Sequence, residues 1–188
     1  MLSMLSAVAL TLIGAGLVWL NKPAHSQSWQ GEQAAYFMVG LAGACLGFMS
    51  LILPPQPSTL GLMLEQLCLY AALPLLASVE FSKLIKRDFS RQVWGRILLA
   101  IAAVFELCRR NNVLDEMLLI TLGIGAVVFI LAAPKKPLGL GWLQAGIWGS
   151  LAALSLTAAL TLPTTAVCAL ALLSAFHPKD FSATSSAQ

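Results

Sequence analysis

The last long apolar segment, Leu138 to Phe176, contains 39 residues and no Lys, Arg, Asp or Glu. As one helix it would be roughly 58 Å long, about twice the ~30 Å hydrocarbon core of a bilayer. Pro163 interrupts the segment, and proline is well tolerated in the first turn of a helix. The segment therefore predicts two membrane-spanning helices that meet near Pro163.

The composition of the whole chain supports a lipid environment. Of its 188 residues, 59% are hydrophobic and only 10% are charged, whereas soluble domains carry roughly 25% charged residues. A small soluble domain keeps too much surface to hide this amount of apolar material. We therefore predict an all-α, polytopic transmembrane helix bundle whose solvent is the lipid bilayer.

Proline-rich and charged links divide the rest of the chain into further apolar segments. Pro54-Pro55-Gln56-Pro57 ends one of them, Ser58 is placed to cap the next, and Pro74 should kink that next helix. A single bundle is expected over residues 1–181, followed by a flexible tail at 182–188. The predicted spans are residues 4–20, 34–53, 59–79, 93–107, 113–133, 138–160 and 163–176. Because the last is short, six spans with a kinked or re-entrant end is the alternative.

The placement of Lys and Arg predicts the orientation, because cytoplasmic links carry an excess of both. With seven spans and the N-terminus outside, nine basic residues are cytoplasmic and only Arg109 and Arg110 are external. Six spans would move Lys179 outside and give eight against three. The nine are Lys22, Lys83, Lys86, Arg87, Arg91, Arg96, Lys135, Lys136 and Lys179. This pattern favours seven spans, an external N-terminus and the cytoplasmic (inner) membrane of a bacterium.

Two acidic residues fall within predicted spans, where an ionisable side chain is costly and is by default a functional hypothesis. Glu65 lies roughly 10 Å from the outer end of its helix, and Glu106 roughly 7–8 Å from the outer end of the next. Arg109 and Arg110 follow Glu106 at the spacing that pairs side chains on one helix face. The predicted outer polar cluster comprises Glu65, Glu106, Arg109 and Arg110, with Asp115 and Glu116 at its rim.

Two interpretations of this cluster stay open. The acids and arginines can neutralise one another and fasten the helix ends. Alternatively, they can line a small outward pocket for an ion, a polar solute or a lipid headgroup, and a Glu65 without a basic partner could carry a proton.

Small residues recur at four-residue spacing in two predicted spans, a pattern that lets membrane helices approach closely. The candidate packing stripe comprises Gly141, Ala145, Gly149 and Ala153 in one span, and Gly43 and Gly47 in another. Such a stripe can pack within the bundle or against another membrane subunit.

The remaining features predict no chemistry. Lys83, Lys86, Arg87 and Arg91 form a cytoplasmic basic patch suited to anionic headgroups. No catalytic, nucleotide-binding or metal-binding motif occurs, and the four cysteines form no C-x-x-C pair. We therefore expect no cofactor, no metal and no nucleic-acid partner.

Three functions fit these observations. The first is a non-catalytic accessory, assembly or scaffold component of a membrane complex. The second is a transporter or channel for a small solute or for protons, which uses the outer acids. The third is a membrane enzyme acting on a lipid headgroup. The absence of catalytic motifs favours the first and makes an enzyme the less expected outcome.

Overall fold

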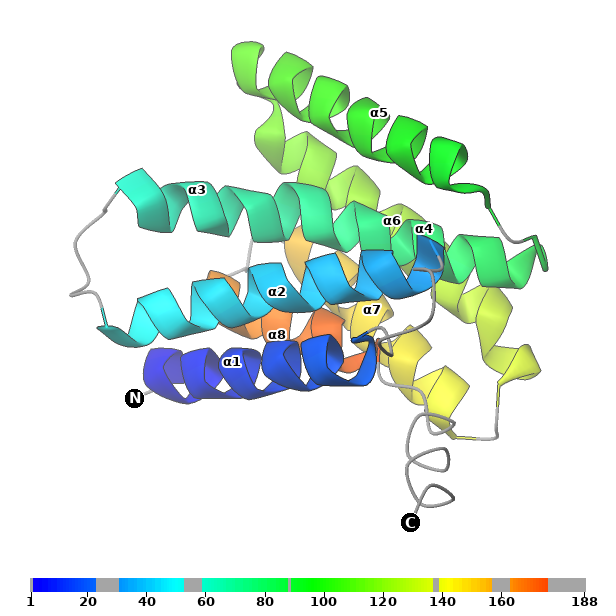
Figure 1. Ribbon diagram of the computed structural model, residues 1–188, viewed down its shortest axis with the longest axis horizontal. Helices are drawn as coiled ribbons and strands as arrows, with labels where there is room; N and C mark the ends of the chain where they lie inside the picture. The colour runs from blue at the N-terminus through cyan, green and yellow to red at the C-terminus, as the bar shows by residue number, and fades with distance from the viewer. Residues whose placement is uncertain are drawn as a thin grey trace.

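The computed structural model describes residues 2–22, 31–52, 59–87, 89–136, 139–156 and 163–175. These residues form seven helices and no strand (Figure 1). The third helix has three parts, and a short 3-10 turn follows the fifth. The elements are α1 (Leu2–Leu20), α2 (Gly31–Ile52), α3 (Thr59–Leu67) with a π-helical turn (Cys68–Ala72) and α4 (Leu73–Leu84), α5 (Arg91–Arg110), α6 (Leu114–Ala132) with the 3-10 turn (Ala133–Lys135), α7 (Leu140–Leu156) and α8 (Thr164–Leu173).

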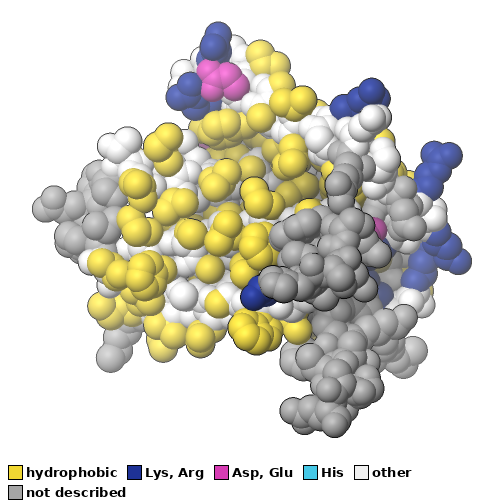
Figure 2. Space-filling view, in the orientation of Figure 1, with side chains coloured by type: hydrophobic (Ala, Val, Ile, Leu, Met, Phe, Trp, Pro, Cys, Tyr) yellow, Lys and Arg dark blue, Asp and Glu magenta, His cyan; other side chains and the backbone are white. Residues whose placement is uncertain are grey.

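Four of these helical segments are long and apolar enough to cross a membrane: Ser3–Leu20, Gly31–Ile52, Thr59–Leu84 and Leu114–Lys135. Two shorter helices, α7 and α8, are also apolar, whereas α5, which covers the predicted span 93–107, is not among these apolar segments. Figure 2 shows a broad apolar face, with Lys and Arg gathered at its edges. The chain is therefore a multi-pass membrane protein with several apolar helices.

The long helix Thr59–Leu84 changes its hydrogen bonding just before Pro74. The backbone N–H of Leu73 donates to the carbonyl of Cys68, five residues earlier. Proline has no N–H to donate and its ring crowds the preceding turn, and a π-turn is one way to absorb such a defect. The distortion that the sequence predicts at Pro74 thus takes the form of a π-helical turn.

Glycines allow α1 and α2 to pack closely. A Cβ added at Gly40 would lie 2.9 Å from the carbonyl oxygen of Gly14, and one at Gly47 would lie 2.7 Å from that of Ala7. On α2, Gly43 faces α8, where an added Cβ would lie 2.6 Å from a methyl carbon of Leu172. Close packing at these glycines stabilises the contacts between helices, because the hydrophobic effect does not drive helix association in lipid.

Different polar contacts join the helices at the two ends of the bundle. At one end, the hydroxyls of Ser6 and Thr165 lie 2.7 Å apart and connect α1 to α8. At the other end, the Lys135 ammonium donates to the Leu84 carbonyl over 3.0 Å. The helix α4 extends to Leu84, beyond the predicted boundary at residue 79, and so carries Glu80 and Lys83 within its last turns. This extension positions the site described below.

Helix α5 lies at one edge of the bundle (Figure 1). Most of its residues are exposed or half-buried, and Trp94 is its one fully buried side chain among those described. Trp94 stacks edge-on against Phe89 with ring centroids 5.8 Å apart. On the neighbouring face, Phe105 contacts Tyr70 at 5.5 Å between centroids.

Candidate functional site

Part of the predicted outer cluster forms a compact ion triad at the end of α5. The Arg109 guanidinium donates to both oxygens of Glu106, over 2.9 and 3.0 Å. Arg110 donates to the same carboxylate over 2.9 Å. All three side chains are partly exposed, and Figure 2 shows an acid between basic side chains at this edge. Exposed pairs of this kind contribute little to stability.

No ion pair between described residues joins the other members of the predicted cluster to this triad. Glu65 is half-buried on α3 and accepts a hydrogen bond from the Thr164 hydroxyl at the start of α8. No ion pair joins Glu65 to Arg109 or Arg110 within the ranges the structure describes. Asp115 and Glu116 are exposed in the first turn of α6, where the helix dipole favours acidic residues.

A second polar site, the Glu80 network, lies at the opposite end of the bundle and is buried. Glu80 is only 1% exposed. Its carboxylate accepts a hydrogen bond from the Lys136 ammonium over 2.7 Å and another from the Tyr36 hydroxyl over 2.9 Å. Lys83 lies 3.6 Å from the same carboxylate and donates to the Tyr36 hydroxyl over 2.7 Å. A buried carboxylate is tolerated only when it is paired in this way.

Lys136 carries the network to α7 and α8. It donates to the Gln144 side-chain oxygen over 2.6 Å, and the Gln144 amide donates to the Ser174 carbonyl over 2.7 Å. The Trp148 indole donates to the Ser174 hydroxyl over 2.9 Å. The network therefore connects α2, α4 and α7 with the C-terminal ends of α6 and α8.

A side branch fixes the start of α2. The Ser82 hydroxyl lies 2.8 Å from the Glu32 carboxylate and donates to it.

Phe129 stacks on Trp148 with ring centroids 5.0 Å apart, and the Lys136 ammonium lies 5.0 Å from the Phe129 ring centre. The cation is thus enclosed by its carboxylate, an amide and an aromatic face.

Sequence reasoning missed this network because it treated Glu80 as the first residue of a charged link. Its members are far apart in the chain, so no local spacing reveals them. Two signals were present: Gln144 lies alone in an apolar segment, and Glu80 precedes Lys83 at i+3 spacing.

The residues of the predicted basic patch differ in exposure, because Lys83 belongs to the Glu80 network. Lys83 turns inward and its side chain is 32% exposed, whereas Lys86 and Arg87 are exposed. Arg91 begins α5.

The predicted packing stripe on α7 is also divided between two faces. Gly141 faces the end of α6, where an added Cβ would lie 2.9 Å from the Ala133 Cα, and Ala145 is buried. By contrast, a Cβ added at Gly149 would meet nothing within 4 Å, and Ala153 is exposed. Gly43 and Gly47 face α8 and α1 within the chain. The outer half of the α7 stripe therefore faces away from the bundle.

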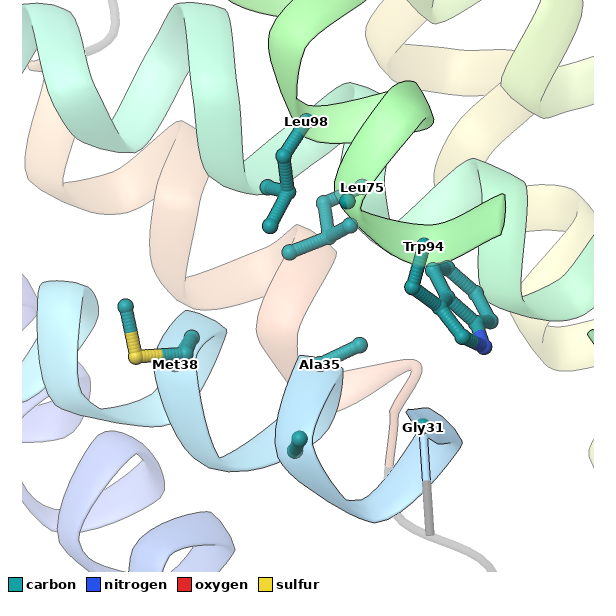
Figure 3. Close-up of a pocket in the computed structure, with 8 residues that line it drawn as sticks. Gly31, Ala35, Met38, Leu75, Trp94 and Leu98 are labelled. Atoms are coloured by element: carbon teal, nitrogen blue, oxygen red, sulfur yellow. The ribbon is translucent and has the colours of Figure 1, made fainter. Parts of the chain in front are cut away.

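A third feature is an apolar groove between α2 and α5, which we call the α2–α5 groove (Figure 3). Its volume is about 330 Å³. Its walls are apolar side chains and glycines from α2, α4 and α5: Gly31, Ala34, Ala35, Met38, Leu75, Trp94, Gly95 and Leu98.

Within the described ranges, no group of three His, Cys, Asp or Glu residues is arranged to hold a metal ion. No family model, curated protein or solved structure matches the chain.

Proposed function

We propose that the chain is a non-catalytic accessory, assembly or scaffold component of a membrane complex. The observation that carries the proposal is the Glu80 network. Its buried charges and amides are paired with one another in contacts that join separate helices. Such a network stabilises the relative positions of the helices. It leaves no unpaired acid or base within the network for proton transfer or nucleophilic attack.

The proposal includes the topology of seven spans with the N-terminus outside, in a bacterial cytoplasmic membrane. The alternation of helix ends supports it. Ser6, Glu65 and Thr164–Thr165 meet at one end, whereas Tyr36, Glu80, Lys136 and Ser174 belong to contacts at the other. Lys86, Arg87 and Lys135 lie at the second end, so the positive-inside rule makes that end cytoplasmic.

The outward half of the α7 stripe is the surface that we propose for another subunit. Gly149 and Ala153 are four residues apart, and Gly146 lies beside them on α7. A Cβ added at Gly146 or Gly149 would meet nothing within 4 Å, and Ala153 is exposed, so this surface leaves room for a close helix. In lipid, such small residues favour helix contacts over contacts with acyl chains.

A matched pair of glycine variants tests this role. Gly149→Leu fills the proposed contact surface, and Gly123→Leu makes the same change on α6, where an added Cβ also meets nothing within 4 Å. Membranes of the cells that naturally make the protein are solubilised in mild detergent and separated on a native gel. We expect the wild type and Gly123→Leu to migrate in one larger complex, and Gly149→Leu to leave it while remaining folded.

Two outcomes contradict the proposal. One is that all three proteins migrate as the isolated chain. The other is proton or solute flux through liposomes that contain only the purified chain, abolished by Glu65→Gln. That flux would support the transporter that the outer acids suggested.

A further inference from the structure

Two of the four cysteines meet in the core of the bundle. Cys68 begins the π-helical turn of the third helix, and Cys168 lies on α8, far along the chain. Both side chains are fully buried and belong to the same apolar core. The thiols are free and in hydrogen-bonding contact with each other. The fold therefore brings together two thiols that no local spacing in the sequence pairs.

A second contact joins the same two helices one turn earlier. The Thr164 hydroxyl of α8 donates a hydrogen bond to the Glu65 carboxylate of α3. Cys68 lies three residues after Glu65, and Cys168 lies four residues after Thr164. Because one helical turn is about 3.6 residues, both contacts lie on the sides where the two helices face each other. The pairing of the cysteines therefore follows from the way α8 packs beside the third helix.

The position of the pair in the bundle favours oxidation. Cys68 and Cys168 lie one turn inside the end where Glu65 and Thr164 meet. In the orientation proposed above, this end faces the outside of the cytoplasmic membrane. Disulfides form and persist in that compartment, whereas cytosolic thiols are kept reduced.

We propose that Cys68 and Cys168 form an intrachain disulfide that links α8 to the third helix. The bond forms by thiol–disulfide exchange with a disulfide-carrying oxidant. The thiolate of one cysteine attacks the oxidant and releases its first thiol, and the other cysteine then displaces the second. Two cysteine thiols are thereby oxidised to one disulfide, and the oxidant is reduced to two thiols, which take up the two protons.

Burial determines when this exchange occurs. Neither thiol has exposed surface in the assembled bundle, so the oxidant must reach the two cysteines before α8 packs. The same burial then protects the finished bond from reducing thiols. The bond does not involve the α7 stripe, so it can form whether or not the chain is an accessory subunit.

The other two cysteines provide internal references for a test. Cys45 is exposed on α2 and Cys108 is half-buried on α5. Bacterial cells that produce the full-length protein are quenched with acid, which protonates thiols and stops exchange. The protein is then denatured, treated with N-ethylmaleimide with or without prior reduction, and analysed by peptide mass spectrometry.

Without reduction, we expect N-ethylmaleimide to label Cys45 and Cys108 and not Cys68 or Cys168. Reduction should expose all four cysteines to the reagent and remove a cross-linked peptide that contains Cys68 and Cys168. Cys68→Ser should make Cys168 reactive without reduction, because its partner is lost. Cys45→Ser is the matched control and should leave the pair protected.

Three results would overturn the proposal. Labelling of all four cysteines without reduction would show that the native protein holds no disulfide. Protection of Cys168 that survives Cys68→Ser would assign it a different partner. A bond that forms only when reduced, purified protein is refolded with oxidised glutathione would reject the native disulfide and also contradict the external placement of this end. Its absence from both samples would reject the pairing alone. None of these measurements depends on Gly149, so failure of the accessory role is detected separately.

Discussion

The two ends of this bundle handle charge in opposite ways. At one end, Glu106, Arg109 and Arg110 form an ion triad on α5, and their side chains are 37%, 55% and 75% exposed. At the other end, the side chains of Glu80 and Lys136 are 2% and 8% exposed and lie 56 residues apart in the chain. The triad is local in sequence and exposed, whereas the Glu80 network joins distant residues and is buried.

This difference determines what each site can contribute. Exposed ion pairs on one helix are screened by water and salt, and their formation does not require any other helix. The Glu80 network forms only when α2, α4 and α7 and the ends of α6 and α8 are assembled, because each supplies a partner. The network therefore couples the positions of these helices, and the triad does not.

The largest loss of stability is expected from Glu80→Gln. This change leaves the Lys136 ammonium buried without a counter-charge, and breaking one side of a buried ion pair costs about 3–5 kcal/mol. The free energy of unfolding, measured by denaturant titration of the purified protein in detergent micelles, should fall by about that amount. A loss no larger than that of an exposed substitution would mean that water reaches Glu80 and that the network is not dry.

A smaller effect is expected when both charges are removed together. Lys136→Met alone should destabilise the protein, because it leaves the Glu80 carboxylate with only Tyr36 and the half-exposed Lys83. The double variant Glu80→Gln/Lys136→Met should lose less than the sum of the two single losses. The difference, taken from a double-mutant cycle, should be roughly 0.5–3 kcal/mol. Strictly additive losses would show that the two side chains do not interact.

Local patterns predicted much of the fold. The apolar segments and their proline-rich ends indicated the helices, because helix length in lipid is constrained by bilayer thickness. The Glu106–Arg109–Arg110 pairing follows from helical spacing alone, so its residues could be named in advance. The Glu80 network could not be named in advance, because the sequence places Glu80 at the start of a charged link. Its partners Lys136 and Tyr36 are brought to it only by tertiary packing.

The same limit applies to the small-residue stripe and to the α2–α5 groove. Four-residue spacing on α7 indicated a packing face, but only the arrangement of α6 shows that Gly141 faces inward while Gly149 does not. The groove is created by the loose position of α5 against α2, and the residues that line it come from three helices. Single-helix patterns do not encode such relationships.

The smallest loss of stability is expected from Glu106→Gln, which removes the acid from the triad that Glu106 forms with Arg109 and Arg110. Arg109 and Arg110 remain solvated, and no other described helix supplies a partner to the triad. We expect no measurable change in the unfolding midpoint in low or high salt, because water replaces the lost pairing. Glu80→Gln in the same titration is the positive control. If Glu106→Gln lowered the midpoint as far as Glu80→Gln does, the end of α5 would have to be packed against another element, and the contrast between the two ends would fail.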